Sequence, residues 1–177
     1  MSAETPFGVE QMQLYFATTA GAATPAAGNL VGAFRGEPTI SDVAASATWR
    51  GQNRAPSHVV FHDRDISMTI PGFSFDSSVA MAQFWNGTHT SASTLHGGAA
   101  TAREDKVTVN SKPLDGEWLI EGLNTGDGKK FQILAHKGFV SSINPTIART
   151  DFATMDLNLT LLADASDDVW SIFHALA

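Results

Sequence analysis

Histidine has the widest chemical use of any residue in this chain, because imidazole binds metals and transfers protons near neutral pH. The sequence contains six histidines. His58 and His62 have the spacing that would bring two metal ligands together on a helix. Residues 59–61 are VVF, which is typical of a strand, and strand positions four apart lie roughly 13 Å from each other. We therefore expect no metal site at His58, His62 and Asp63.

Two glycine-containing stretches resemble functional loops without completing either motif. Residues 122–130, GLNTGDGKK, have the wrong glycine spacing for a phosphate-binding loop, and neither Ser nor Thr follows the lysines. Residues 72–76, GFSFD, end in Asp76 where the nucleophile elbow of hydrolases has glycine. The first stretch predicts a hairpin turn, and the second predicts no serine nucleophile.

Acidic and aromatic residues also have simple structural interpretations. Residues 163–168, ADASDD, are typical of a turn, where short carboxylates bond to the backbone; calcium binding there is the less favoured alternative. Trp85, Trp118 and Trp170 lie in apolar sequence and are expected in the core rather than stacked on sugars. We therefore predict a protein that is not an enzyme, with no catalytic residue, no metal and no cofactor.

The charge balance argues against a surface that binds nucleic acid. The formal net charge is -7 and the pI is about 5.2, whereas proteins that hold phosphate concentrate Lys and Arg. An acidic wall suits a conduit along which DNA slides without sticking. Charged residues make up only 16% of the chain, so the exterior is expected to be rich in small polar residues and to face other protein.

Signals for export or membrane insertion are not expected. The N-terminus reads MSAETPFG, with Glu4 and Pro6 where a secretory leader has basic and apolar residues. The chain has no apolar run of the ~18 residues that a spanning helix needs. It also has no cysteine, which excludes disulfides and thiolate metal sites. We expect synthesis in the cytoplasm and no membrane binding.

Alternation of polar and apolar residues dominates the chain and predicts half-buried antiparallel strands. It is clearest at 12–16, 66–70, 107–109 and 150–164. Further strands are expected at 41–49, 58–62, 117–123, 129–136, 138–143 and 169–176. Turn residues at 124–128 and 164–168 predict that the C-terminal half is a series of long hairpins.

The segment 150–164 has the most regular alternation and should have two different faces. One face is apolar: Ala153, Met155, Leu157, Leu159 and Leu161. The other is polar and mildly acidic: Thr154, Asp156, Asn158 and Thr160.

The remaining segments predict one helix and two long loops. Residues 77–86 are almost entirely apolar, and Gly87 is expected to take the left-handed position after the helix. Such a short helix must be held against a sheet. Residues 17–38 and 86–105 are rich in small residues and are expected to be long loops. We predict a single domain over residues 1–177, an antiparallel β-sandwich or barrel with one flanking helix.

This order of elements resembles the major tail tube proteins of long-tailed bacteriophages. Residues 66–87, ISMTIPGFSFDSSVAMAQFWNG, resemble their strand-then-helix passage. Residues 150–175, TDFATMDLNLTLLADASDDVWSIFHA, resemble their closing hairpin. The resemblance implies a virion protein that forms six-membered rings stacked into a hollow tube, with other tail proteins as partners and DNA as non-specific cargo.

Within such a tube, Thr154, Asp156, Asn158 and Thr160 are expected to face the lumen; the alternative is that they face solvent on a monomeric sandwich. Loops 17–38 and 86–105 are candidates for ring-to-ring contacts. Two other functions remain open. One is another virion protein without chemistry, such as a capsid decoration or tail terminator protein. The other is a ligand-binding β-sandwich, such as a carbohydrate-binding module.

Overall fold

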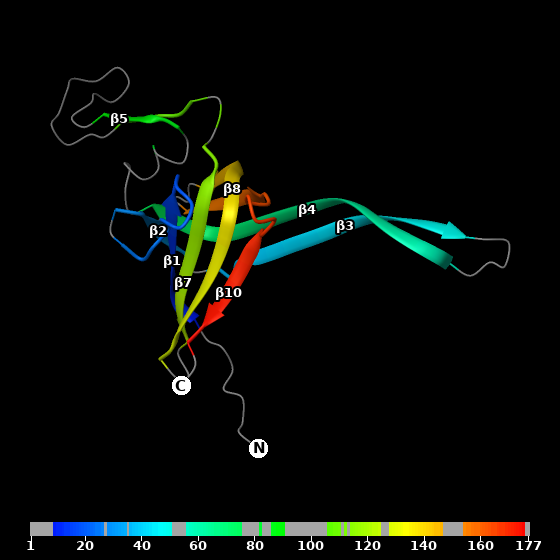
Figure 1. The fold of residues 1–177 in the computed structure, drawn as a ribbon. Helices are drawn as coiled ribbons and strands as arrows, with labels where there is room; N and C mark the ends of the chain where they lie inside the picture. Colours follow the sequence, from blue (N-terminus) through cyan, green and yellow to red (C-terminus); the bar gives the residue numbers. More distant parts are fainter. Residues whose placement is uncertain are drawn as a thin grey trace.

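The computed structural model describes residues 9–26, 28–34, 36–50, 56–75, 82, 86–90, 106–110, 112, 114–124, 128–146 and 154–175. Its regular elements are ten strands (Figure 1). They are β1 (Val9–Ala17), β2 (Leu30–Phe34), β3 (Thr39–Arg50), β4 (Pro56–Phe75), β5 (Thr88–Thr90), β6 (Lys106–Thr108), β7 (Gly116–Asn124), β8 (Lys130–Thr146), β9 (Thr154–Leu161) and β10 (Trp170–His174).

The main sheet closes on itself into an antiparallel barrel. Its hydrogen-bonded order is β10-β8-β7-β1-β2-β4-β3, and β9 pairs with both β4 and β8. The circuit β8-β7-β1-β2-β4-β9 therefore returns to β8. β3 continues the sheet from β4, and β10 continues it from β8, so these two strands form its outer edges. The predicted mainly-β antiparallel fold is confirmed.

The core fills the inside of this barrel, and all six strands of the circuit contribute to it. Among its largest fully buried side chains are Trp118 of β7, Phe34 of β2 and Phe73 of β4, each at most 1% exposed. The Trp118 indole donates a hydrogen bond to the Gly138 carbonyl at 2.9 Å and packs against Phe16. Burial of these apolar faces is the main stabilising term of such a barrel.

Two predicted breaks between strands were wrong, because one continuous strand runs through each of them. Residues 58–62 and 66–70 belong to the single strand β4, and 129–136 and 138–143 belong to β8. In β4 the expected break is instead a β-bulge: the register shifts between Ala44 and Ala45 of β3, and Asp63 has φ 50°. An extra residue in one strand bends the ladder without ending it.

The expected loop at 17–38 contains a strand, and part of it covers the barrel. Residues 30–34 form β2, which pairs with β1 and β4. Before β2, Ala23 packs against Tyr15 and Leu119 on the outer face of the sheet. The Ala23 amide donates to the Glu117 carboxylate at 2.9 Å. In the second expected loop, residues 88–90 form β5, and 91–105 lie outside the described residues.

The predicted helix at 77–86 lies largely outside the described residues, which include only Ala82 and Asn86 of this range. Ala82 is helical and 5% exposed, and its carbonyl accepts a hydrogen bond from the Gly87 amide at 2.6 Å. The left-handed residue is Asn86, with φ 51°, rather than Gly87 as predicted. This 6→1 bond is the Schellman arrangement. Within the described residues, no helix is long and apolar enough to cross a membrane.

β3 and β4 extend well beyond the barrel as a two-stranded arm (Figure 1). Ile66 is the last β4 residue toward the arm that also pairs with β9, through Leu161. Beyond it β4 pairs only with β3, as far as Arg50 opposite Pro56. Described side chains at the base of the arm, 43–46 and 63–65, are all exposed. The arm therefore has solvent on both faces there.

Gly32 allows β2 to join the barrel, which leads to a stability prediction. A Cβ at Gly32 would lie 2.0 Å from the Ser74 carbonyl oxygen of β4, whereas a Cβ at Gly28 would meet nothing within 4 Å. We expect Gly32→Ala to lower the free energy of unfolding by about 1–3 kcal/mol or more, the usual cost of overpacking. Denaturant unfolding measures this change in the free energy of unfolding. The control Gly28→Ala should change stability little, and equal stability of both variants would contradict this packing.

Candidate assembly surfaces

One wall of the barrel presents a polar face outward, which we call the polar wall. It lies on the start of β3, on β4 and β9, and on the C-terminal half of β8. Register places one row of its residues as Thr39, Thr69, Asn158 and Ser142, and a second row as Ser41, Ser67, Thr160 and Phe139. Asp156 opposite Asn144 continues it. Phe139 is its half-buried aromatic member.

The alternation of β9 creates this wall. Leu157 and Leu159 are fully buried and Leu161 is 4% exposed, while Asp156 is exposed and Asn158 and Thr160 are half-buried. The predicted separation of faces is confirmed for these residues. For Thr154 the structure describes only the backbone, which pairs with Thr146. Whether any of the four residues faces a lumen stays a prediction.

Side chains on the polar wall bond to one another across the strands. Thr69 donates to the Asn158 side-chain oxygen at 2.8 Å, and the Asn158 amide donates to Ser142 at 2.8 Å. The Gly72 amide donates to the Asp156 carboxylate at 3.1 Å. No described residue of the wall is Lys or Arg. The wall therefore consists largely of hydroxyls and amides, many already hydrogen-bonded, with a slight negative charge.

The two outer edges of the sheet also expose apolar side chains. On β10, Ile172 is 60% exposed and Phe173 is 50% exposed, and they point to opposite faces of the strand. On β3, Val43 is 61% exposed. Open strand edges with apolar side chains pair readily with other chains. These edges and the arm are the surfaces of this chain best suited to contact further copies or partners.

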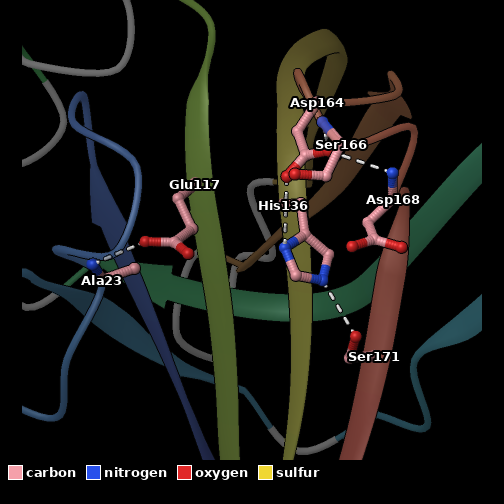
Figure 2. A network of polar contacts seen from close by, with 7 residues as sticks. All are labelled: Ala23, Glu117, His136, Asp164, Ser166, Asp168 and Ser171. Carbon is pink, nitrogen blue, oxygen red and sulfur yellow. Dashed lines mark hydrogen bonds and ion pairs between the residues drawn. The ribbon is translucent and has the colours of Figure 1, made fainter.

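A second polar cluster, not anticipated from sequence, joins β8, β10 and the turn between β9 and β10 (Figure 2). His136 Nε2 lies 2.8 Å from Ser171 Oγ, and its Nδ1 lies 3.8 Å from Asp164 Oδ2. Asp164 also accepts from the Ser166 and Asp168 amides at 2.7 and 2.9 Å. The 163–168 segment is thus the predicted turn.

The cluster has the serine–histidine–carboxylate order of hydrolases but not their geometry. In hydrolases the carboxylate hydrogen-bonds the histidine and fixes its orientation. Here the 3.8 Å separation exceeds hydrogen-bond range. One oxygen of Asp164 is already occupied by two backbone amides. Its contacts bind the β9–β10 turn and the edge strand β10 to β8, which is a structural role.

The structure also places the histidines and tryptophans that the sequence analysis considered for metal binding or sugar stacking. His58 and His62 lie along β4, as the strand interpretation predicted. Among the described residues, no group of three or more His, Asp or Glu could hold a metal ion. Trp118 is 1% exposed and Trp170 packs against the core. Trp85 lies outside the described residues.

Comparison with solved structures identifies proteins of similar fold. One is described as the anti-feeding prophage cap, the tube-terminating cap, with TM-score 0.54 and 13% identity over 99% of this chain and 95% of that one. Another comes from the PVC sheath–tube complex of an extracellular contractile injection system, in the extended state, with TM-score 0.52 and 12% identity over 98% and 95%.

A third similar structure is a chain from the PVC sheath/tube terminator in the extended state, with TM-score 0.53 and 11% identity over 97% of this chain and 99% of that one. No protein-family model matches the chain, and no curated protein matches it. The chain therefore shares its fold, over nearly its whole length, with chains from the anti-feeding prophage cap and from an extracellular contractile injection system.

The turn at Asp164 gives a pH prediction. The pKa of the Asp164 carboxyl is lowered below its ordinary value of 3.8, first by the Asp168 amide and further by the Ser166 amide and His136. A lowered folded-state pKa contributes stability that is present above the unfolded pKa and is lost as the pH falls through the folded pKa. Asp164→Asn should therefore be less stable than wild type at pH 7, and the difference should shrink below pH ~4.

Chemical denaturation between pH 7 and pH 3 measures this difference. Asp168→Asn is the matched control, because the Asp168 contact with Asp164 uses its backbone amide. The control should follow the wild-type pH profile. A gap between Asp164→Asn and wild type that stays constant with pH would contradict the assignment.

Proposed function

We propose that this chain is the major tail tube subunit of a long-tailed phage or related tail-like particle. Each copy contributes one domain, six copies form a ring, and rings stack into a hollow tube through which DNA passes as non-specific cargo. The chain's partners are its own copies and other tail proteins, and its location is the virion tail. Its similarity in fold to components of contractile injection systems supports this proposal.

The arm is the observation that carries the proposal. A two-stranded hairpin is at best marginally stable in water, yet here one extends from the barrel with exposed side chains on both strands at its base. Its sequence beyond the base includes ATW at 47–49 on β3 and VVF at 59–61 on β4. Contact with a neighbouring copy would cover such a ribbon. A head-to-tail contact of this kind generates rings or filaments.

The polar wall is the surface we assign to the lumen, with Asp156, Asn158 and Thr160 near its centre and Thr154 at its end. A conduit for polyanionic cargo needs a surface that does not bind it. Hydroxyls and amides that already bond to one another offer few free donors to phosphate. The described part of the wall has no basic side chain, so its charge repels DNA rather than retaining it.

A tube-terminating ring is the second candidate function. Two of the similar structures are described as a tube-terminating cap and a sheath/tube terminator. A terminator shares the barrel and the ring but stops at one layer, whereas a tube subunit must stack repeatedly. The assembly state of the purified protein separates the two: electron microscopy should show hollow filaments for a tube subunit and single rings for a terminator.

Shortening the arm tests its role in assembly. Ala45 and His62 are opposite each other in the register, so residues 46–61 can be replaced by Asn-Gly, a two-residue hairpin turn. We expect this variant to remain folded, because the barrel core is untouched, and to lose filaments in negative-stain images. A wild-type melting transition controls for folding. Filaments formed as readily as by wild type would contradict an assembly role for the arm.

Cysteine labelling tests the lumen assignment, since the chain has no native cysteine. Ser67 is exposed on the polar wall opposite Thr160, and Leu123 is 48% exposed on β7 across the barrel. Ser67→Cys, modified with biotin, should bind streptavidin as free subunits but not within assembled filaments, because streptavidin is too large to enter a narrow tube.

Leu123→Cys is the control for this experiment and should bind streptavidin in both states. Equal binding at position 67 before and after assembly would place the polar wall outside the tube. The outcome is independent of the arm truncation, because filaments can form even where the wall assignment fails.

A further inference from the structure

The segment between β1 and β2 lies against the outside of the barrel. We call its described residues, 18–26 and 28–29, the strap. Its underside is apolar: Ala23 is 7% exposed and packs against Tyr15 of β1 and Leu119 of β7, and Leu134 of β8 packs against the same group. We call Tyr15, Leu119 and Leu134 the covered patch. The strap itself contains no charged residue.

Hydrogen bonds within the strap give it a shape of its own. The Asn29 side-chain amide donates to the Ala22 carbonyl at 2.7 Å, and the Asn29 backbone amide donates to the Ala26 carbonyl at 3.0 Å. The Ala22 amide donates to the Thr19 carbonyl at 3.2 Å. Gly21, with φ 76°, takes the left-handed position within that turn. A segment whose bonds close on itself can move as one unit.

Glu117 of β7 ties the middle of the strap to the barrel. Among the side chains that the structure describes, it is the only charged one that is buried, at 5% exposed. Its carboxyl Oε2 accepts a hydrogen bond from the Ala23 amide at 2.9 Å (Figure 2). A buried carboxyl group costs free energy unless it is hydrogen-bonded, and a buried backbone amide also needs an acceptor. The two groups therefore satisfy each other.

Cavities lie beneath the strap on both sides of this contact. One, of about 520 Å³, is lined in part by Thr18 and Glu117. The other, of about 350 Å³, is lined in part by Ala22 and Asn29. The strap is therefore packed closely against the barrel at Ala23 and less closely on either side. The hydrogen bond at Ala23 thus carries a large share of the strap's attachment.

We propose that Glu117 is a positioning residue that holds the strap down over the covered patch, and that loss of its hydrogen bond lets the strap lift as one unit. The end of the strap stays attached, because the Asn29 carbonyl accepts from the Phe16 amide of β1 at 2.9 Å. Lifting exposes apolar surface that a free subunit otherwise hides. The inference concerns the isolated subunit and does not rest on the proposed function.

Thiol labelling measures the lifting of the strap, because the chain has no native cysteine. Ala23→Cys places a thiol on the buried underside, and Ala26→Cys places one on the exposed side. Glu117→Met keeps the length of the side chain but removes the acceptor oxygen. In the Glu117→Met background, a maleimide should react with the thiol at position 23 faster by about tenfold or more, the factor expected for losing a buried hydrogen bond. Position 26 should react equally fast in both backgrounds.

Two further variants control for the chemistry at position 117. Glu117→Gln keeps an oxygen acceptor and should bring the rate at position 23 back toward that of the wild-type background. Glu121→Met changes a glutamate on the same strand and face, whose carboxylate instead accepts from Lys130 and Gln132 at 2.9 and 2.7 Å. It should label like wild type. An unchanged rate in Glu117→Met, or an equal increase in Glu121→Met, would overturn the proposal.

Hydrogen exchange distinguishes lifting of the strap from its unfolding. The Ala22 and Asn29 amides bond within the strap, so Glu117→Met should leave their protection unchanged while the Ala23 amide exchanges faster. Loss of protection at all three amides would mean that the strap unfolds. Equal loss in β7 and β8 would mean that Glu117 supports the whole barrel. Either result contradicts a strap that moves as one unit.

A measurement without any change at Glu117 covers the case in which Glu117→Met does not fold. The effect of urea on an opening reaction scales with the surface that the opening exposes. Lifting exposes only the covered patch, so labelling of Ala23→Cys should depend weakly on urea below the unfolding transition. A dependence as steep as that of global unfolding would show that position 23 becomes accessible only by unfolding, and the proposal would be rejected.

Discussion

Pairing of β9 along both of its edges is the constraint on which the rest of the structure depends. β9 bonds to β4 on one side and to β8 on the other, and this double pairing turns an open sheet into a closed barrel. Once both neighbouring strands are fixed, each β9 side chain can point to only one face of the sheet. A register shift of one residue would exchange the apolar and the polar face. Leu157, Leu159 and Leu161 must then enter the core. Asp156, Asn158 and Thr160 must form the polar wall.

Closure of the barrel also explains why β3 and β10 are exposed. The circuit of six strands satisfies its own hydrogen bonds, so a strand added to either side of it leaves a free edge. β3 follows β4 past the point where β9 ends, and the pair continues as the arm. β10 is held by its pairing with β8, by the cluster around His136 and by the packing of Trp170 against the core.

Sequence reasoning predicted what depends on local pattern and missed what depends on distant contacts. The strand class, the two faces of β9 and the turn at Asp164 follow from periodicity and from short polar side chains. β2 was missed because LVGAF lies within a tract of small residues, and its Gly32 is required only by the approach of Ser74. The continuity of β4 was missed because a bulge at Asp63 resembles a break. The His136 cluster could not be predicted, since it joins residues far apart in the chain.

The low sequence identity to the similar structures is consistent with a fold that depends on the pattern of residue types rather than on particular residues. They share 11–13% of residues with this chain over nearly its full length. A barrel of this kind requires apolar residues at alternate positions, a few close approaches such as Gly32 against Ser74, and turns that fit. Many residue types satisfy each requirement, since cores tolerate exchange at constant volume. Specific polar contacts, such as that of His136 with Ser171, have fewer substitutes because they need a donor and an acceptor in register. Identities of 11–13% over nearly the whole chain are therefore compatible with the same fold, because most positions require a residue type and only a few require a particular partner.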